Sequence, residues 1–557
     1  MAIQYTLRIP QPHTHYVEVT ATFPAGQPLD LMLPVWTPGS YLVREYSRQI
    51  DEIPGCTKTA KNRWRAPGGG VISYRVYCHE LTVRTNYVDA QFALIIPAAT
   101  FLTSLSLSDQ PHEVTIEHSY AQAHTGLPST SKNQFRAANY DQLVDCPIYL
   151  GNPAVHEFTV EGKSHLLVNE AESGSWDGPA SAAAAKKIVQ QYAKMMRGLP
   201  YDRYLFLNLI VESGGGIEHA NSTVLMASRW AWGNTDNPKA DPREAAKPSR
   251  HGWLDLVSHE FFHAWNVKRL RPIELGPFDY EKENYTESLW FAEGVTSYYG
   301  PLMARRAGLA PDQAFLTDLS RIVGQVQGAP GRLVQSLADA SRDAWIKHYR
   351  PQENSSNTTI SYYTKGALVA WILDVRIRQA TNNQKSLDDA IRLAYSRFSG
   401  AHGFSPSDLF ALFDEVAGQS LQVRPLVDRP GELDYSGALA WLGLRFTPAA
   451  AGKPWLGAQL KAGVIEGITA NSPAHHADLA VGDELIAIDG HRLTPDNLDR
   501  VLASAGAKAK ATYSRRGRLR ECPLQPSPEP RRAWQLEMDP SATPEQRRNF
   551  ASWLQSY

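Results

Sequence analysis

The sequence predicts a multidomain α+β protein, because strand-like and helix-like patterns occupy different parts of a long chain. At 557 residues the chain is too long for one hydrophobic core, since domains usually hold about 100–200 residues. Apolar and polar residues alternate in the first part, helical patterns dominate beyond residue 251, and strand-like runs return after Trp455. We therefore expect a β-rich N-terminal domain, a domain with a helical portion and a compact C-terminal module.

Residues 1–165 are expected to form a β-sandwich-like N-terminal domain. Segments 5–9 and 15–23 alternate apolar and polar side chains, which is the period of a half-buried strand. Clusters of Pro, Gly and Asn separate such segments, and no long helical period appears among them. Short strands between frequent turns are typical of a sandwich of two sheets.

Residues 166–425 are expected to form a second domain that begins with mixed structure and ends in helices. Pro179 opens an Ala-rich helix. A strand-like run over 204–211 leads to three glycines, and an exposed loop rich in Asn, Asp, Pro and Lys is expected over 230–250. Helical periods then cover 252–268, 287–306, 311–326, 364–380, 386–398 and 406–417.

Two segments complete the chain. Residues 450–525 combine short strand-like runs with Gly-containing turns and are expected to form the compact module. Residues 526–557 begin with a stretch rich in Pro and charged residues and are expected to form a C-terminal tail.

Composition narrows the classes of function. Hydrophobic residues make up 43% and charged residues 20% of the chain, as in ordinary soluble globular proteins. A formal net charge of −1 gives no reason to expect nucleic acid or a membrane surface as a partner. The four cysteines are widely separated and include no C-x-x-C pair, so no cysteine-based zinc or redox motif is expected.

Targeting signals are not visible in the sequence. The N-terminus has no basic stretch followed by an apolar run, and no apolar stretch approaches 18 residues. We therefore expect neither a signal peptide nor a membrane span, and a cytoplasmic location. A chain trimmed from a secreted or periplasmic precursor would look the same.

The strongest chemical signal is the pair His259 and His263, which Glu260 accompanies in an H-E-x-x-H pattern. Residues four apart on a helix are neighbours on one face, so both imidazoles can reach one zinc ion. Glu260 lies beside the pair, where it can take a proton from an attacking water molecule. An apolar stripe recurs at every fourth position of the same helix, at Val257, Phe261 and Trp265. The alternative is a helix with two incidental histidines.

A catalytic zinc site needs a third protein ligand and one open position. Glu293 is the main candidate, because it lies C-terminal to the histidine pair and is followed by Gly294, where another helix can approach closely. Glu287 is the competing candidate, and otherwise a surface or supporting carboxylate. One zinc ion per chain is expected.

Two further segments could serve the reaction centre. Tyr363 precedes an apolar helix, and its hydroxyl could stabilise an oxyanion, although a tyrosine there could equally anchor the core. Gly215 and Gly216 would let a substrate backbone approach closely, and Glu218 after them could bind a free amino terminus. The alternative for this second segment is a flexible hairpin with a solvated carboxylate.

These residues together resemble the gluzincin peptidases, and specifically the glycyl aminopeptidase family with a C-terminal PDZ domain. Residues 259–272 are similar to the family's extended zinc helix. Residues 289–294 look like the Leu-Trp-x-x-Glu-Gly segment that carries the third ligand, and residues 34–48 resemble the family's N-terminal signature. The resemblance implies a thermolysin-like catalytic domain over 166–425, with zinc held by His259, His263 and Glu293.

The resemblance also implies roles for the two further segments. Tyr363 matches the Tyr-x-Lys-Gly placement of a transition-state tyrosine, and residues 215–219 look like the Gly-x-Met-Glu-Asn exopeptidase motif, with Glu218 at the amine-binding position. Ile217 and His219 depart from that motif, so the pocket there can differ. The family implies a zinc-dependent aminopeptidase that removes N-terminal residues, especially Gly and Ala, from peptides with a free N-terminus.

The module over 450–525 resembles a PDZ domain. Residues 455–458 look like the carboxylate-binding loop, where backbone amides capture a chain end and a strand is added to a sheet edge. Residues 472–474 and 482–490 are similar to later PDZ landmarks. Whether the module binds a peptide ligand or only packs on the peptidase stays open.

Two rival interpretations remain. An endopeptidase could use the same zinc site, with Glu218 merely structural. A PDZ-bearing binding or scaffold protein could carry a vestigial site, although such a site has no need to keep His259, Glu260, His263 and Glu293 together.

Overall fold

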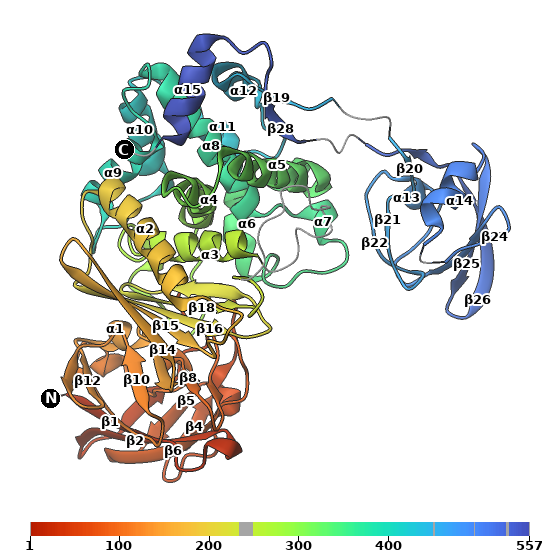
Figure 1. Ribbon diagram of the computed structural model, residues 1–557. Helices are drawn as coiled ribbons and strands as arrows, with labels where there is room; N and C mark the ends of the chain where they lie inside the picture. Colours follow the sequence, from red (N-terminus) through yellow and green to blue (C-terminus); the bar gives the residue numbers. More distant parts are fainter. Residues whose placement is uncertain (1, 233–248, 449–451, 495, 531–533, 556–557) are drawn as a thin grey trace.

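The computed structural model describes residues 2–232, 249–448, 452–494, 496–530 and 534–555, and most of the loop predicted over 230–250 lies outside these ranges. The chain forms a β-rich N-terminal domain, a central domain of one sheet and many helices, and a small β-rich module set to one side (Figure 1). This confirms a multidomain α+β fold with a β-rich N-terminal domain and a helical part after it. Within the described ranges, no helix is both long and apolar enough to cross a membrane.

The N-terminal domain consists of three sheets, in the strand orders β11-β12-β9-β1-β2-β6, β10-β13-β8-β7 and β3-β5-β4. Strand β1 pairs antiparallel with β2, where Tyr5 lies opposite Ala21, and parallel with β9. Alternate residues of β1 and β2 are buried, as the period of two predicts. The elements are β1 (Ile3–Arg8), β2 (Tyr16–Ala25), β3 (Leu29–Met32), β4 (Thr57–Ala60), β5 (Arg63–Ala66), β6 (Gly69–Tyr77), β7 (Tyr87–Val88), β8 (Ala93–Ile95), β9 (His112–Glu117), β10 (Gln122–Thr125), β11 (Ser129–Ser131), β12 (Gln134–Ala137), α1 (Tyr140–Val144) and β13 (Ile148–Gly151).

The central domain begins with a five-stranded sheet in the order β14-β15-β16-β18-β17, whose last strand is an edge. Strands β15, β16 and β18 run parallel, and β17 pairs antiparallel with β18. Its elements are β14 (Ala154–Val160), β15 (Lys163–Glu170), α2 (Gly178–Met196), β16 (Arg203–Ile210), β17 (Gly215–Glu218) and β18 (Ser222–Ala227). The predicted border at residue 165 therefore falls inside this sheet, because a half-buried strand has the same period in either domain.

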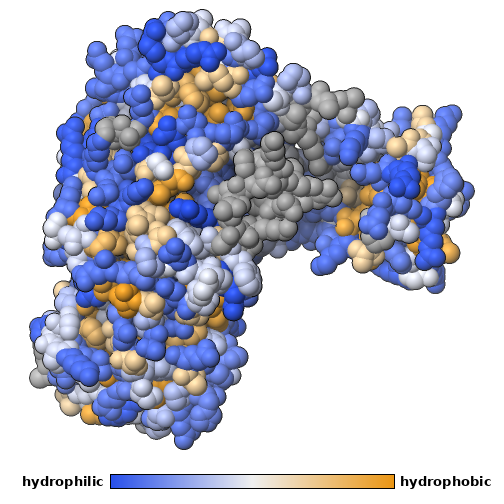
Figure 2. All heavy atoms as spheres, viewed as in Figure 1, coloured by the Kyte–Doolittle hydropathy of each residue, from blue (hydrophilic) through white to orange (hydrophobic). Residues whose placement is uncertain are grey.

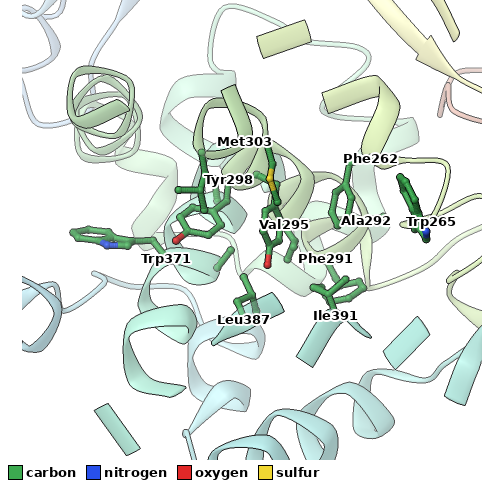
Figure 3. Packing of buried hydrophobic residues seen from close by; sticks show 14 of the residues in the cluster. Phe262, Trp265, Phe291, Ala292, Val295, Tyr298, Met303, Trp371, Leu387 and Ile391 are labelled. Carbon is green, nitrogen blue, oxygen red and sulfur yellow. The ribbon is translucent and has the colours of Figure 1, made fainter. Parts of the chain in front are cut away.

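The helical part packs on this sheet. The predicted helix over 252–268 ends early, at Phe262, and the one over 287–306 is a π-helical segment, Trp290–Val295, that continues as α4. Buried side chains from α3, α4, α8 and α9 form a continuous core behind them (Figure 3). The helices are α3 (Arg250–Phe262), α4 (Thr296–Arg306), α5 (Asp312–Gly328), α6 (Leu337–Arg342), α7 (Ser355–Thr358), α8 (Tyr362–Ala380), α9 (Leu387–Phe398), α10 (Pro406–Ala417), α11 (Val423–Asp428) and α12 (Ser436–Leu442).

The C-terminal module has a hydrophobic core of its own and a sheet in the order β21-β22-β23-β25-β26. It touches the central domain through Asn357 of α7, whose side chain donates to the Ile468 carbonyl at 2.7 Å and accepts from the Ala470 amide at 2.8 Å. Its identity as a PDZ domain stays a prediction. The elements are β20 (Pro454–Trp455), β21 (Ala458–Lys461), β22 (Val464–Ile468), α13 (Pro473–His476), β23 (Glu484–Ile488), β24 (His491–Arg492), α14 (Leu498–Ser504), β25 (Ala509–Arg515), β26 (Arg518–Leu524) and β27 (Ser527–Pro528).

The segment predicted to be a tail returns to the central domain, which corrects that prediction. Strand β28 (Leu536–Met538) pairs with β19 (Leu444–Phe446), and α15 (Pro544–Leu554) packs on α12. Trp553 is fully buried and donates its indole N–H to the Tyr298 hydroxyl at 2.7 Å. Few apolar residues anchor α15, so the Pro and charged residues before it dominate the sequence pattern.

Most of the hydrophobic side chains are enclosed in these cores. On the face in Figure 2, hydrophilic residues predominate and hydrophobic ones lie in small scattered groups. Such scattered exposure is normal for a folded protein and marks no binding surface by itself.

Candidate metal centre and active site

Three side chains predicted as zinc ligands converge at one point between α3 and the π-helical segment. Nε2 of His259 and Nε2 of His263 lie 3.2 Å apart, and Oε2 of Glu293 lies 3.4 Å and 3.3 Å from them. Zinc–ligand bonds of about 2.0–2.1 Å in a tetrahedron would separate neighbouring ligand atoms by about 3.3 Å. The donor types and their spacing therefore fit one zinc ion with a fourth position left for water or substrate.

Hydrogen bonds through Asn266 connect two of these side chains, His263 and Glu293, and fix their relative positions. Nδ1 of His263 donates to the Asn266 carbonyl at 2.7 Å, which leaves Nε2 free to bind metal. The Asn266 side chain donates to the carbonyls of Phe291 and Ala292 at 3.0 and 3.2 Å. The turn after the histidine helix is thus tied to the backbone just before Glu293.

The approach of α8 explains why a glycine follows Glu293. A Cβ on Gly294 would lie 2.6 Å from the Cα of Gly366 in α8, so neither position tolerates a side chain. The predicted close helix approach is therefore present. The competing carboxylate, Glu287, is partly exposed and pairs instead with Arg342, away from the histidines.

Glu260 is buried beside the metal-ligand cluster. Its Oε2 has no hydrogen-bond partner in the described part of the chain. Burial raises the pKa of Glu260, and the nearby carboxylates of Glu218 and Glu293 add to the rise, while His263 opposes it. Gly216 in β17 lies directly against this side chain, since a Cβ there would collide with the Glu260 carboxylate. A carboxyl group in this setting is suited to exchange protons.

Glu218 ends the edge strand β17 and is also buried, at 3% exposure. Its Oε1 has no partner among the described residues, and its ligating atoms lie within 4.8 Å of those of Glu260 and His263. The N-terminal domain closes over it: a Cβ on Gly39, whose φ is +88°, would lie 2.6 Å from Oε2 of Glu218. An unpaired carboxylate in such a place favours a cationic ligand.

Tyr363 lies at the start of α8, next to the histidine pair. Its ring is 6.3 Å from that of His259 and stacks at 5.5 Å on His348. Burial raises the pKa of the Tyr363 hydroxyl well above its usual value, with Glu293 adding to the effect. The hydroxyl therefore keeps its proton at neutral pH and can donate it.

A buried ion network surrounds His219. Asp145, at the end of α1, accepts from His219 at 3.2 Å and from the Ala220 amide at 2.8 Å, and pairs with Lys268 at 2.5 Å. Burial would raise the pKa of Asp145, but Lys268 and His219 outweigh it and lower that pKa to about 2. The histidine at position 219 thus has a structural partner in the N-terminal domain.

Several residues near the site were not identified from the sequence. Tyr349 lies 6.2 Å ring to ring from Tyr41 of the N-terminal domain and 5.6 Å from His348, on which Tyr363 stacks. Arg84, also from the N-terminal domain, donates to the Gly216 carbonyl at 3.1 Å. No local motif marks Tyr349, Arg84 or Asp145, since their partners lie far away in the sequence. Gly39 and Tyr41 lie within residues 34–48, the segment that resembles the family's N-terminal signature.

Comparison with known proteins gives two family matches. Residues 4–152 match the model of the peptidase M61 N-terminal domain, and residues 252–369 match that of the M61 glycyl aminopeptidase. The crystal structure of an aminopeptidase N family protein from Idiomarina loihiensis is similar over 99% of this chain and 100% of its own, with 26% identity and a TM-score of 0.90. An M1 zinc metallopeptidase mutant from Deinococcus radiodurans aligns over 78% of this chain and 95% of its own, with 14% identity and a TM-score of 0.47. No curated protein matches the chain.

Proposed function

Because the chain belongs to the M61 glycyl aminopeptidase family, we propose that it is a zinc-dependent aminopeptidase that removes single residues from the free N-termini of peptides. Residues with small side chains, such as Gly and Ala, are among its proposed substrates. His259, His263 and Glu293 are the proposed zinc ligands, with Glu260 and Tyr363 as catalytic residues.

The observation that carries this proposal is the buried carboxylate of Glu218 next to Glu260 and His263, whose Oε1 has no partner among the described residues. In an amino acid the α-nitrogen and the carbonyl carbon are about 2.5 Å apart, given the standard bond lengths and angle. An ammonium group bound to Glu218 would therefore hold the first carbonyl of the chain at the metal-ligand cluster. Gly39 and Gly216 make room for the Glu218 and Glu260 carboxylates, since a Cβ at either position would collide with them. Gly215 and Gly216 are the proposed substrate-binding glycines.

The protein groups would divide the reaction between them. Zinc, when bound, supplies a Lewis acid that lowers the pKa of water and polarises the carbonyl. Glu260 takes the proton of the attacking water and later gives it to the leaving amine. The Tyr363 hydroxyl donates a hydrogen bond to the developing oxyanion, a contribution commonly worth about 3–4 kcal/mol.

Hydrolysis of a short peptide and of its N-acetylated twin tests the proposal against an endopeptidase on the same site. We expect cleavage of the free-amine peptide only, and abolition by a chelator with recovery on adding Zn²⁺. Equal cleavage of both peptides would instead make Glu218 a structural residue. A purified chain that contains no zinc and stays inactive after zinc is added would favour a scaffold protein with a vestigial site.

For the C-terminal module we propose a PDZ domain. Its strand β21 is at the edge of its sheet, where an extended peptide could be added as a further strand. The Asn357 contacts to the backbone at 468 and 470 support a packing role as well. Titration with peptides of free and amidated C-terminus would test ligand binding, since capture of a carboxylate should distinguish the two.

A further inference from the structure

The edge strand β17 has polar backbone groups that face away from its sheet. The His219 amide donates to the Ser222 carbonyl at 2.9 Å, so the alternation of an antiparallel pair turns the amide and carbonyl of Gly216 away from β18. Such an edge can pair with an extended peptide. A peptide whose amine is bound to Glu218 and whose first carbonyl lies at Glu260 runs along this edge toward Gly216, since Gly216 lies against Glu260.

Arg84 of the N-terminal domain occupies the far end of this edge. Its Nη2 donates to the Gly216 carbonyl at 3.1 Å, so a peptide that pairs with β17 finds that carbonyl already taken. Standard bond lengths place this nitrogen within about 9 Å of Oε1 of Glu260. Residues in a strand advance by about 3.4 Å each, so two residues from an amine at Glu218 extend about 7 Å and end opposite Gly216. The Arg84 guanidinium therefore lies where the second residue of a bound substrate ends.

Arg84 and its neighbour Arg44 are partly buried, and neither forms an ion pair within the described part of the chain. The Nε atoms of both are buried and have no hydrogen-bond partner among those residues. Nη2 of Arg44 donates to the Ser40 hydroxyl at 3.0 Å, next to the Gly39 that lies against Glu218. Burial lowers the pKa of Arg44, and the like charge of Arg84 adds to the decrease. Because an uncompensated buried charge is costly, the two guanidinium groups favour a negatively charged ligand.

We propose that Arg84 binds the C-terminal carboxylate of a dipeptide whose amine is held by Glu218, with Arg44 adding positive charge, so that short substrates such as Gly-Ala are favoured. This inference rests on the proposed aminopeptidase function and adds a second charged anchor to it. A planar guanidinium can donate two parallel hydrogen bonds to a carboxylate. Nη2 of Arg84 carries a second proton beyond the one that it donates to the Gly216 carbonyl.

The dipeptide Gly-Ala, its C-terminal amide and the 4-nitroanilide of Gly test the inference on the full chain supplied with Zn²⁺. We expect kcat/KM for Gly-Ala to exceed that for its amide at least about tenfold, because a guanidinium bonds a carboxylate more strongly than a neutral amide. Gly-Ala-Ala-Ala-Ala and its amide should differ less than about twofold, because their C-termini lie beyond Arg84. Hydrolysis of the anilide with equal kcat/KM for Gly-Ala and its amide would overturn the inference alone. Failure to hydrolyse any of these substrates would overturn the proposed function with it.

An acidic side chain in the second residue is another source of a carboxylate. The amides of Gly-Asp and Gly-Asn separate this source from the C-terminus, since neither has a terminal carboxylate. We expect kcat/KM for the two amides to agree within about threefold. A preference for the Gly-Asp amide without a preference for Gly-Ala over its own amide would overturn the inference and assign Arg84 to acidic side chains.

Variants of the two arginines give a readout that does not depend on absolute activity, the ratio of kcat/KM for Gly-Ala to that for its amide. Arg84→Gln should bring this ratio close to one. Arg44→Gln leaves the Gly216 contact intact and should lower the ratio about threefold, since it removes a nearby charge and no direct bond. Arg136→Gln is the matched control, because the Arg136 side chain is 50% exposed in the same domain and pairs with Glu113. A ratio that stays at the control value in Arg84→Gln, or in Arg44→Gln should Arg84→Gln fail to fold, would overturn the inference.

Discussion

Gly216 lies against the side chain of Glu260, so closely that a Cβ at position 216 would come within 2.6 Å of the Glu260 Cγ. The edge strand β17 and the histidine helix α3 therefore share one surface at this point. The Arg84 hydrogen bond to the Gly216 carbonyl fixes the strand from the other domain. The Glu260 side chain therefore lies between its own helix, α3, and the backbone of β17, which the Arg84 hydrogen bond holds in place.

Replacing Gly216 by Ala should displace the Glu260 carboxylate. A misplacement of about 1 Å at a catalytic group can cost about 10²-fold in rate, so kcat should fall by about that factor. Steady-state kinetics on an aminoacyl anilide will measure it. Gly214→Ala is the matched control, because a Cβ at position 214 meets no atom within 4 Å. A Gly216→Ala enzyme with control-like kcat would contradict the proposed role of Glu260.

Glu293→Gln should abolish stoichiometric zinc binding, because the third ligand loses its charge. Metal content after dialysis, measured by mass spectrometry, should drop from one zinc per chain to a small fraction. Glu287→Gln removes an equivalent carboxylate from a site that pairs only with Arg342 among the described residues. That variant should keep its zinc, and loss of zinc there instead would reverse the ligand assignment.

Glu260→Gln should keep its zinc and lose turnover. The isosteric amide fills the same space next to Gly216 but cannot accept and return a proton. A general acid–base group commonly accelerates a reaction about 10²–10⁴-fold. We therefore expect kcat to decrease by at least about 10²-fold. Metal analysis on the same sample separates the two effects, and zinc loss would mean that Glu260 is itself a ligand.

Tyr363→Phe should lower kcat by about 10²–10³-fold with little change in KM, because the hydroxyl acts mainly in the transition state. Tyr362 provides the comparison, since its ring stacks on Tyr363 at 4.7 Å and its buried hydroxyl has no partner among the described residues. Tyr362→Phe should retain near-normal kcat. Equal losses in the two variants would point to packing rather than to hydrogen bonding.

Asp145→Asn should destabilise the protein at neutral pH by about 3 kcal/mol, because it leaves Lys268 buried without its charge partner. The folded pKa of Asp145, about 2, lies below its usual value of about 3.9. Its stabilising contribution is therefore present above about pH 4 and is lost as the pH falls toward 2. The difference in thermal midpoint between the wild type and the variant should shrink over that window. A difference independent of pH would rule out the charge interaction as its cause.

Local sequence signals indicated two of the side chains that come together at the centre of the candidate site, His259 and His263. His259 and His263, four apart at the C-terminal end of α3, share one face because of local helical geometry. Strand alternation likewise predicted the β-rich N-terminal domain. The histidine spacing and the strand alternation depend on neighbours within one or two turns of the chain, whereas the close approach at Gly294 involves Gly366 of α8.

The parts that could not be predicted depend on contacts between distant segments. Asp145 stabilises the strand end at His219 from another domain, and no spacing rule links the two positions. Gly39 closes the Glu218 site in the same way. The border predicted at residue 165 falls inside the sheet of the central domain, because β14 has the alternation of a half-buried strand, as strands of the N-terminal domain do. The tail was misassigned because a few buried side chains, Leu536, Trp553 and Leu554, anchor a segment in which polar residues predominate.

The pairing of β19 with β28 brings together the two ends of the long stretch that carries the C-terminal module, since Phe446 lies opposite Leu536. The C-terminal module is therefore inserted into the central domain between β19 and β28, and is not attached at its end. A truncation after β19 would also remove α15 and expose the core of the central domain. Loss of folding or activity in that variant would therefore not report on the module. Deletion of residues 449–533, with β19 and β28 joined by a short turn, would isolate the contribution of the C-terminal module to activity and stability.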